Sequence, residues 1–230
     1  GSCEEIINIW RNKENKVFVL RSSDGIKDTK LFYNNLLPYL GNAFFLAEDA
    51  SINDRDDQRT GELWSEIRFD PSFKNAYRHS ANAQPLHTDG SYIPSFPNAS
   101  LMCCIKNEVD GGETVFIDSN KLVECLEEED QDMLKRLKST EVIPSRSGDS
   151  RNAKVITVDK DNVYLNWNYY CLKRDKEDKV PNFLENFFNY LNNSTLLKRS
   201  LVEVRLRAGD AVLWKDSEVL NGRNSFESSI

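Results

Sequence analysis

The hexapeptide Pro-Leu-His-Thr-Asp-Gly, residues 85–90, contains one of only two histidines in this 230-residue chain. On a β-strand, residues i and i+2 project from the same face, so His87 and Asp89 should point together while Thr88 points away. An imidazole and a carboxylate side by side can bind a first-row divalent metal, and with a third ligand they form a facial triad that suits Fe(II). A His-x-Asp pair alone is more often a hydrogen-bonded structural feature, so the rest of the sequence is needed to choose between a metal site and a structural pair.

The bulk composition favours a soluble globular protein. The formal net charge of −7 and the pI near 5.1 argue against a general nucleic-acid binder, because such proteins need a basic face. No apolar run approaches the roughly 18 residues that a membrane span needs. The opening Gly-Ser without a methionine is typical of a cloning remnant, and no signal peptide is recognisable after it.

The cysteines favour a reducing compartment. Their number is odd and no Cys-x-x-Cys spacing occurs, so neither a disulfide framework nor a zinc ribbon is indicated. Reduced thiols in the cytoplasm are the simplest interpretation. The five residues are Cys3, Cys103, Cys104, Cys125 and Cys171.

The elements that must position the His-x-Asp pair are mostly short strands, each bounded by Gly, Asn, Asp or Pro. Helical spacing of apolar residues predicts helices over 28–41, between Asp28 as N-cap and Gly41, and over 119–139 and 180–193. The pattern predicts a mainly β (α+β) fold, a sandwich or a barrel, in a single domain spanning 1–230. The strands are expected at 15–24, 62–69, 99–107, 113–118, 153–159, 162–170, 201–207 and 210–216.

Two further blocks follow the His-x-Asp pair: Gly-Gly-Glu-Thr at 111–114, and AGDAVLWKDSEVLNGRNSF at 208–226. With these blocks in this order, the chain resembles the taurine dioxygenase and clavaminate synthase-like family of Fe(II)- and 2-oxoglutarate-dependent oxygenases. That family shows H-T-D-G, then G-G-x-T, then G-D-x-x-x-W and H-G-R-x-x-F. The resemblance implies a double-stranded β-helix (jelly roll) with flanking helices, and it implies Fe(II) and 2-oxoglutarate as cofactors.

The resemblance assigns roles by position. His87 and Asp89 would be the first two metal ligands, and Thr114 would bind the distal carboxylate of 2-oxoglutarate. Arg223 is the Arg of the H-G-R block, where a cosubstrate contact and a local structural salt bridge are both open. Trp214 is expected in the core.

The chain departs from the family at the third ligand, where Asn221 stands in place of histidine. An amide oxygen is a neutral and harder donor than imidazole. Asn221 could be an engineered inactivation, a natural variant that still binds metal, or the mark of a protein that only binds a ligand. The family also places an Arg for the 2-oxoglutarate carboxylate 10 to 15 residues beyond the third ligand, whereas the sequence given ends at Ile230, nine residues after Asn221.

The resulting hypothesis is an oxygenase that hydroxylates or otherwise oxidises a C–H bond of a small amino-acid-like metabolite of secondary metabolism. Tyr92, Asn168 and Tyr170 are candidate substrate contacts, with Asn168 and Tyr170 on one face of a strand. The polar stretch 49–61 is expected to be a loop and a candidate lid. A non-catalytic ligand-binding jelly roll and a cupin-like isomerase remain alternatives. The expected partner is a small molecule, with neither nucleic acid nor membrane.

Overall fold

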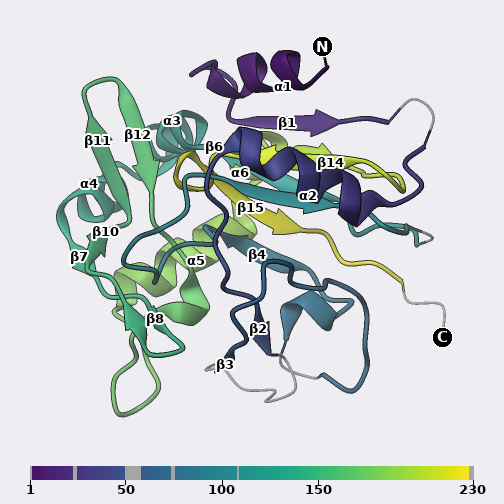
Figure 1. The fold of residues 1–230 in the computed structure, drawn as a ribbon. Coiled ribbons are helices and arrows are strands. Elements are labelled where there is room, and N and C mark those ends of the chain that lie inside the picture. Colours follow the sequence, from purple (N-terminus) through teal and green to yellow (C-terminus); the bar gives the residue numbers. More distant parts are fainter. Residues whose placement is uncertain (1, 23–24, 50–57, 74–75, 108, 228–230) are drawn as a thin grey trace.

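Two antiparallel sheets form the centre of the computed structural model, which describes residues 2–22, 25–49, 58–73, 76–107 and 109–227 (Figure 1). The larger sheet has the strand order β13-β6-β15-β4, and the smaller has the order β1-β14-β5. The larger sheet comprises β13 (Val202–Val204), β6 (Thr114–Asp118), β15 (Val219–Arg223) and β4 (Gln84–His87), and the smaller comprises β1 (Val17–Leu20), β14 (Ala211–Trp214) and β5 (Ser100–Cys103). The expected mainly β (α+β) class is confirmed.

The two sheets face each other across an apolar core. Phe116 of β6 and Trp214 of β14 meet there with their ring centroids 5.5 Å apart. Val204, Val212 and Val219 complete the cluster from neighbouring strands. The predicted core position of Trp214 is therefore confirmed.

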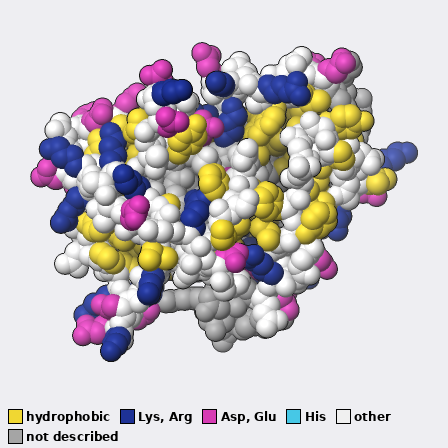
Figure 2. All heavy atoms as spheres, turned by 60° about the vertical axis from the view of Figure 1, so that its left-hand side comes forward, with side chains coloured by type: hydrophobic (Ala, Val, Ile, Leu, Met, Phe, Trp, Pro, Cys, Tyr) yellow, Lys and Arg dark blue, Asp and Glu magenta, His cyan; other side chains and the backbone are white. Residues whose placement is uncertain are grey.

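A second and larger core lies beside the sheets, under the helices. The cluster joins Leu126 and Leu137 to Trp167 and Phe187, and the rings of the last two lie 4.7 Å apart. The elements around it are α3 (Ser119–Glu129), α4 (Gln131–Ser139), α5 (Asn182–Asn193) and α6 (Thr195–Arg199), with the strands β7 (Glu141–Val142), β10 (Ala153–Lys154), β11 (Ile156–Asp159) and β12 (Asn162–Leu165). On this side of the molecule, positive and negative side chains alternate over the surface (Figure 2).

The helix expected at 119–139 is two helices, broken at Asp130. Its backbone angles, φ −157° and ψ 79°, are not helical, and its carboxylate accepts a hydrogen bond from the N–H of Met133 at 2.9 Å. An Asp side chain competes with the helix for backbone donors, which favours a cap over a continuous turn.

The first predicted helix is confirmed as α2 (Thr29–Leu40), with Asp28 as its N-cap and Gly41 closing its last turn. It packs against the smaller sheet through Tyr33, Leu36 and Ala211 (Figure 1). The sequence did not predict α1 (Ser2–Arg11), whose Trp10 contacts Phe18 of β1.

Three strand expectations need correction. The stretch 62–69 contains no strand. The expected strand at 162–170 ends with β12 at Leu165, and a 3-10 turn, η3 (Tyr169–Cys171), follows. Conversely, the sequence did not predict β15, which forms at Val219–Arg223 within the 208–226 block.

The polar stretch 49–61 is partly described. Residues 50–57 lie outside the described part of the chain, and the candidate lid falls mostly on them. The flanks pair as β2 (Glu48–Asp49) with β3 (Gln58–Arg59). A second small ribbon pairs β8 (Ser145–Arg146) with β9 (Asp149–Ser150). Among the described helices, none is long and apolar enough to cross a membrane.

Truncating Phe116 tests the inter-sheet core. Phe116 is only 2% exposed and contacts residues of both sheets, so Phe116→Ala should lower the free energy of unfolding by about 3–5 kcal/mol through lost burial and a residual cavity. Urea denaturation measures this change. Val158→Ala, at a half-exposed position of β11, should stay within about 0.5 kcal/mol of the parent. Equal losses for both variants would contradict this description of the core.

Candidate active site

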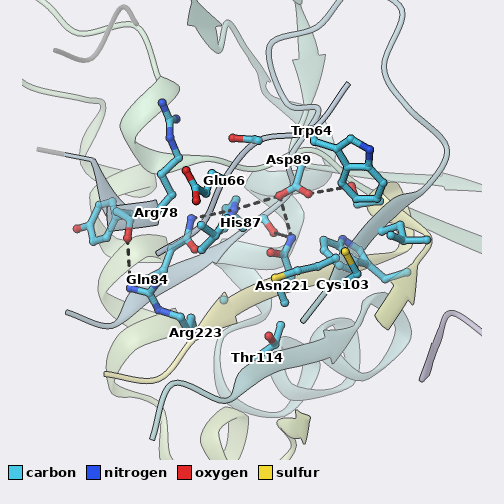
Figure 3. Close-up of a pocket in the computed structure, with 18 of the residues that line it drawn as sticks. Trp64, Glu66, Arg78, Gln84, His87, Asp89, Cys103, Thr114, Asn221 and Arg223 are labelled. Atoms are coloured by element: carbon cyan, nitrogen blue, oxygen red, sulfur yellow. Dashed lines mark hydrogen bonds and ion pairs between the residues drawn. The ribbon is translucent and has the colours of Figure 1, made fainter. Parts of the chain in front are cut away.

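The predicted site residues line one cavity of about 2060 Å³ beside the larger sheet. His87, Asp89, Thr114, Asn221 and Arg223 lie around its inner wall (Figure 3). Tyr92, Asn168 and Tyr170, the candidate substrate contacts, line the same cavity. The structure thus brings together in space residues that are spread over more than half of the sequence.

His87 and Asp89 face each other, although not for the reason that strand geometry predicts. β4 ends at His87, and Asp89 lies in the turn that follows. The His87 Nε2 and Asp89 Oδ1 atoms are 3.2 Å apart. Thr88 points away as expected, and its backbone N–H donates to the carbonyl oxygen of Trp167 at 2.6 Å.

The turn is held by Asp216, a residue that sequence reasoning missed. Its two carboxylate oxygens accept hydrogen bonds from the backbone N–H groups of Asp89 and Gly90, each at 2.8 Å. Asp216 is 1% exposed and lies in the 3-10 turn η4 (Asp216–Glu218) between β14 and β15. Burial raises its pKa to about 7, and the negative charge of Asp89 adds to the effect. An acidic residue two positions after the buried strand β14 was the available sequence signal.

Glycine is needed at position 90 because the turn is crowded. A Cβ there would lie 2.8 Å from Pro97 and 3.2 Å from the Asp216 carboxylate. A side chain would therefore push the turn away from Asp216. The Gly of the His-Thr-Asp-Gly block is explained by this close approach of backbone to carboxylate.

The imidazole of His87 is oriented by its own strand. Its Nδ1 donates to the carbonyl oxygen of Pro85 at 2.8 Å, which leaves the Nε2 lone pair directed at Asp89 in the neutral tautomer. Burial alone would lower the pKa of His87, but the hydrogen bond and the charge of Asp89 outweigh it, so the pKa is raised.

Asn221 joins the pair from the neighbouring strand. In the β15–β4 register Asn221 is the partner of His87, and its side-chain Nδ2 donates to the His87 carbonyl oxygen at 3.0 Å and to Asp89 Oδ1 at 3.3 Å. The other oxygen of Asp89 accepts from Ser100 Oγ at 2.8 Å. Burial raises the pKa of Asp89, but these contacts together with His87 keep it below its ordinary value.

These residues fit a divalent metal at two positions and offer an amide at the third. His87 Nε2 and Asp89 Oδ1 are adjacent, unprotonated donors in the metal-binding state, and the Asn221 amide lies beside them. The described residues contain no group of three or more His, Cys, Asp and Glu side chains suited to a metal. Any further protein donor here must therefore come from another residue type.

Thr114 and Arg223 are partners across the β6–β15 register. The Arg223 Nη2 donates to three backbone carbonyls of the segment 77–82, those of Tyr77, Ser80 and Asn82. Its acceptors are thus carbonyl oxygens rather than the carboxylate of a salt bridge. Its Nε is buried without a hydrogen-bond partner.

The candidate substrate residues come from two local structures, the turn that follows β4 and the region of η3. The Tyr92 hydroxyl donates to Glu48 Oε1 at 2.6 Å, and the hydroxyls of Tyr170 and Tyr77 are 2.8 Å apart. Asn168 accepts from the Tyr170 N–H at 3.2 Å and so caps η3. The shared strand face expected for Asn168 and Tyr170 is wrong, because β12 ends before both.

Four charged side chains beside the cavity form a feature that the sequence did not indicate, here named the charge ring: Glu48, Arg59, Asp149 and Arg146. Glu48 and Arg59 are cross-strand partners in the β2–β3 ribbon, as are Arg146 and Asp149 in the β8–β9 ribbon. Between the ribbons, Arg146 Nε lies 2.9 Å from Glu48 Oε2, and Arg59 pairs with Asp149. The ring therefore ties the two ribbons together with alternating charges.

The raised pKa of His87 can be tested in the metal-free protein. His87 should titrate above its ordinary value of 6.5 because Asp89 stabilises the imidazolium. The contribution of the His87 charge to stability is then fully present below about pH 6.5 and is lost as the pH rises through the raised pKa. In Asp89→Asn, burial dominates and the pKa of His87 should fall below 6.5. NMR titration of the imidazole resonances measures both values, and a lower pKa in the parent than in the variant would refute the assignment.

A double-mutant cycle tests the charge ring. Arg59→Ala and Asp149→Ala should show a coupling of about 1 kcal/mol in the free energy of unfolding, because this pair is partly buried. The exposed Lys121–Glu124 pair, truncated in the same way, is the matched control and should couple by less than about 0.5 kcal/mol. If the two couplings are equal, the ring does not tie the ribbons together.

Comparison with known proteins identifies the family. Residues 43–229 match the model described as "Taurine catabolism dioxygenase TauD, TfdA family". Dioxygenase str8 of Strobilurus tenacellus is 26% identical over 176 residues, which are 73% of this chain and 40% of that protein. Uridine-5'-phosphate dioxygenase of Amycolatopsis sp is 23% identical over 179 residues, 71% of this chain and 62% of that protein. The chain thus spans less than two thirds of the length of these curated relatives.

Solved structures confirm the jelly-roll fold. The non-heme iron oxygenase OrfP, in complex with Fe, succinate and (3S)-hydroxy-L-Arg, aligns with a TM-score of 0.68 at 14% identity, over 100% of this chain and 75% of that one. Asparagine oxygenase, in complex with Fe(II), 3-hydroxyasparagine and succinate, aligns with a TM-score of 0.66 at 12% identity, over 99% and 75%. Together with the family match over most of its length, this shows that the chain belongs to the TauD/TfdA dioxygenase family.

Proposed function

We propose that this protein is an Fe(II)- and 2-oxoglutarate-dependent oxygenase that oxidises a C–H bond of a small amino-acid-like metabolite. The observation that carries the proposal is the pair His87 Nε2 and Asp89 Oδ1, 3.2 Å apart on the wall of a large cavity. The pair stands at the His-x-Asp position of a TauD/TfdA chain, and the solved OrfP structures hold Fe and 2-oxoglutarate.

His87 and Asp89 would hold the metal, with Asn221 at the third position. A bound metal and 2-oxoglutarate would together activate oxygen for attack on an unactivated C–H bond. The chain's own part is positional: Asp216 fixes the turn that carries Asp89, and Pro85 fixes the imidazole. Removing water from around these groups strengthens their electrostatic interactions.

Thr114 and Arg223 would bind the distal carboxylate of 2-oxoglutarate. Both line the cavity on one face of the larger sheet. Arg223 lies two residues along β15 from Asn221, and Thr114 is the partner of Arg223 on β6. The buried Arg223 Nε without a partner supports this role, because a guanidinium edge suits a carboxylate. The Nη2 on the same edge already donates to backbone carbonyls, so Nε is the donor that remains on that edge.

Tyr92, Asn168 and Tyr170 would contact the substrate. Charged side chains of both signs, among them Glu48 and Arg78, line the same cavity, which suits a zwitterionic amino acid. The names of two structural neighbours agree with this class, since asparagine oxygenase and OrfP were solved with hydroxylated asparagine and arginine.

A second candidate function is ligand binding without turnover. The observation in its favour is the Asn221 Nδ2, which donates to Asp89 Oδ1 where the family has a metal-ligating imidazole. In this arrangement an amide N–H, not a lone pair, faces the carboxylate.

Succinate formation distinguishes the two functions. With Fe(II), 2-oxoglutarate and oxygen, the protein should produce succinate slowly, and Asn221→His should raise the rate at least about tenfold because imidazole is the stronger donor for Fe(II). His87→Ala sets the background. Asn189→His, at an exposed position of α5, is the matched control and should leave the rate unchanged.

No succinate above the His87→Ala background, in either the parent or Asn221→His, would reject the oxygenase and favour the non-catalytic candidate. Mass spectrometry of the reaction, run with a panel of free amino acids, would at the same time identify any hydroxylated product.

A further inference from the structure

The third position of the metal site has a second amide beside it, which belongs to Gln84. We propose that Gln84 is a metal ligand in this chain, so that the amide oxygens of Gln84 and Asn221 together replace the imidazole that the family has at position 221. This inference rests on the proposed function, since it needs a metal between His87 and Asp89.

Gln84 reaches the site because β4 contains a β-bulge. Asn221 and Arg223, two residues apart on β15, are the partners of His87 and Gln84, which are three residues apart on β4. In a regular strand, residues 84 and 87 would project from opposite faces. The extra residue in β4 turns Gln84 onto the same face as His87, and re-aiming a side chain in this way is a known use of bulges.

The local sequence is suited to the bulge. Pro85, which cannot donate to a strand ladder, lies within it, and its carbonyl oxygen accepts from His87 Nδ1 at 2.8 Å. Gly222 faces it on β15, where a Cβ would be only 2.8 Å from the Gln84 carbonyl oxygen. The bulge thus orients the imidazole of His87 and also brings the amide of Gln84 to the site.

The side chains of Gln84, His87, Asp89 and Asn221 form a row of close contacts. The Gln84 Nε2 lies 3.4 Å from His87 Nε2, which lies 3.2 Å from Asp89 Oδ1, which lies 3.3 Å from Asn221 Nδ2 (Figure 3). Adjacent ligands in an octahedral set with bonds of about 2.1 Å are roughly 3 Å apart. A half-turn about the last side-chain bond of Gln84 would exchange its nitrogen and oxygen and present the oxygen to the metal. Asn221 would also have to give up its hydrogen bond to the His87 carbonyl oxygen to present its own oxygen.

This ligand set has a chemical consequence. One imidazole, one carboxylate and two amide oxygens form a harder site than the family's two imidazoles and one carboxylate. Oxygen donors suit Mn(II) and similar hard ions, whereas imidazole favours the later transition metals. The parent should therefore prefer Zn(II) over Mn(II) less strongly than Asn221→His does.

Mn(II) binding to the metal-free protein, followed by the EPR signal of free Mn(II), tests the proposal without any turnover. Gln84→Leu should weaken binding about tenfold or more, because it removes an oxygen donor while keeping a side chain of similar size. Gln84→Glu should tighten it by at least a similar factor, because a carboxylate replaces a neutral amide. Gln131→Leu, at an exposed position of α4, is the matched control and should bind as the parent does.

The outcomes separate this inference from the proposed function. If the parent binds Mn(II) and Gln84→Leu binds it equally well, Gln84 is only a hydrogen-bond partner of His87, and the metal site stands without it. If the parent binds no Mn(II), the inference and the proposed metal chemistry both fail. A folding defect in Gln84→Leu would also weaken Mn(II) binding. Tighter binding by Gln84→Glu cannot result from lost stability, so this variant distinguishes the loss of a ligand from a folding defect.

Discussion

The position of Asp89 depends on a buried carboxylate, that of Asp216. Asp89 has left the strand, so strand geometry no longer directs its side chain, and the two N–H bonds to Asp216 hold the turn instead. Gly90 permits the approach, since a Cβ would meet both Asp216 and Pro97. Because Asp216 lies in the link between β14 and β15, the same link joins the two sheets and positions the candidate ligand on the turn.

The central strand β15 completes the arrangement. It lies between β4 and β6, so it carries Asn221 next to His87 and Arg223 next to Thr114. The bulge in β4 adds Gln84 to the same wall. Gln84, His87, Asp89 and Asn221 lie in one row of contacts on this wall. With the two amide oxygens as the proposed ligands, the donors of the site would be harder, which would change the metal that it prefers.

The motif residues were predictable, and the contacts that hold them were only partly so. His87, Asp89, Thr114, Asn221 and Arg223 come from contiguous blocks, and all five line one cavity as expected. Asp216 and Gln84 were missed because their roles come from a turn and a strand irregularity, which residue periodicity does not encode. The strand expected at 62–69 failed for a related reason: propensity favours extension there, but a strand exists only where a partner pairs with it.

The central claim is that His87 and Asp89 share one divalent metal. Anomalous diffraction from crystals soaked with Mn(II) tests it most directly, because the signal locates the ion independently of any reaction. The account predicts a peak within bonding distance, about 2.0–2.3 Å, of His87 Nε2 and Asp89 Oδ1. An ordered His87 and Asp89 with no peak between them, at a Mn(II) concentration that labels other sites, would contradict it.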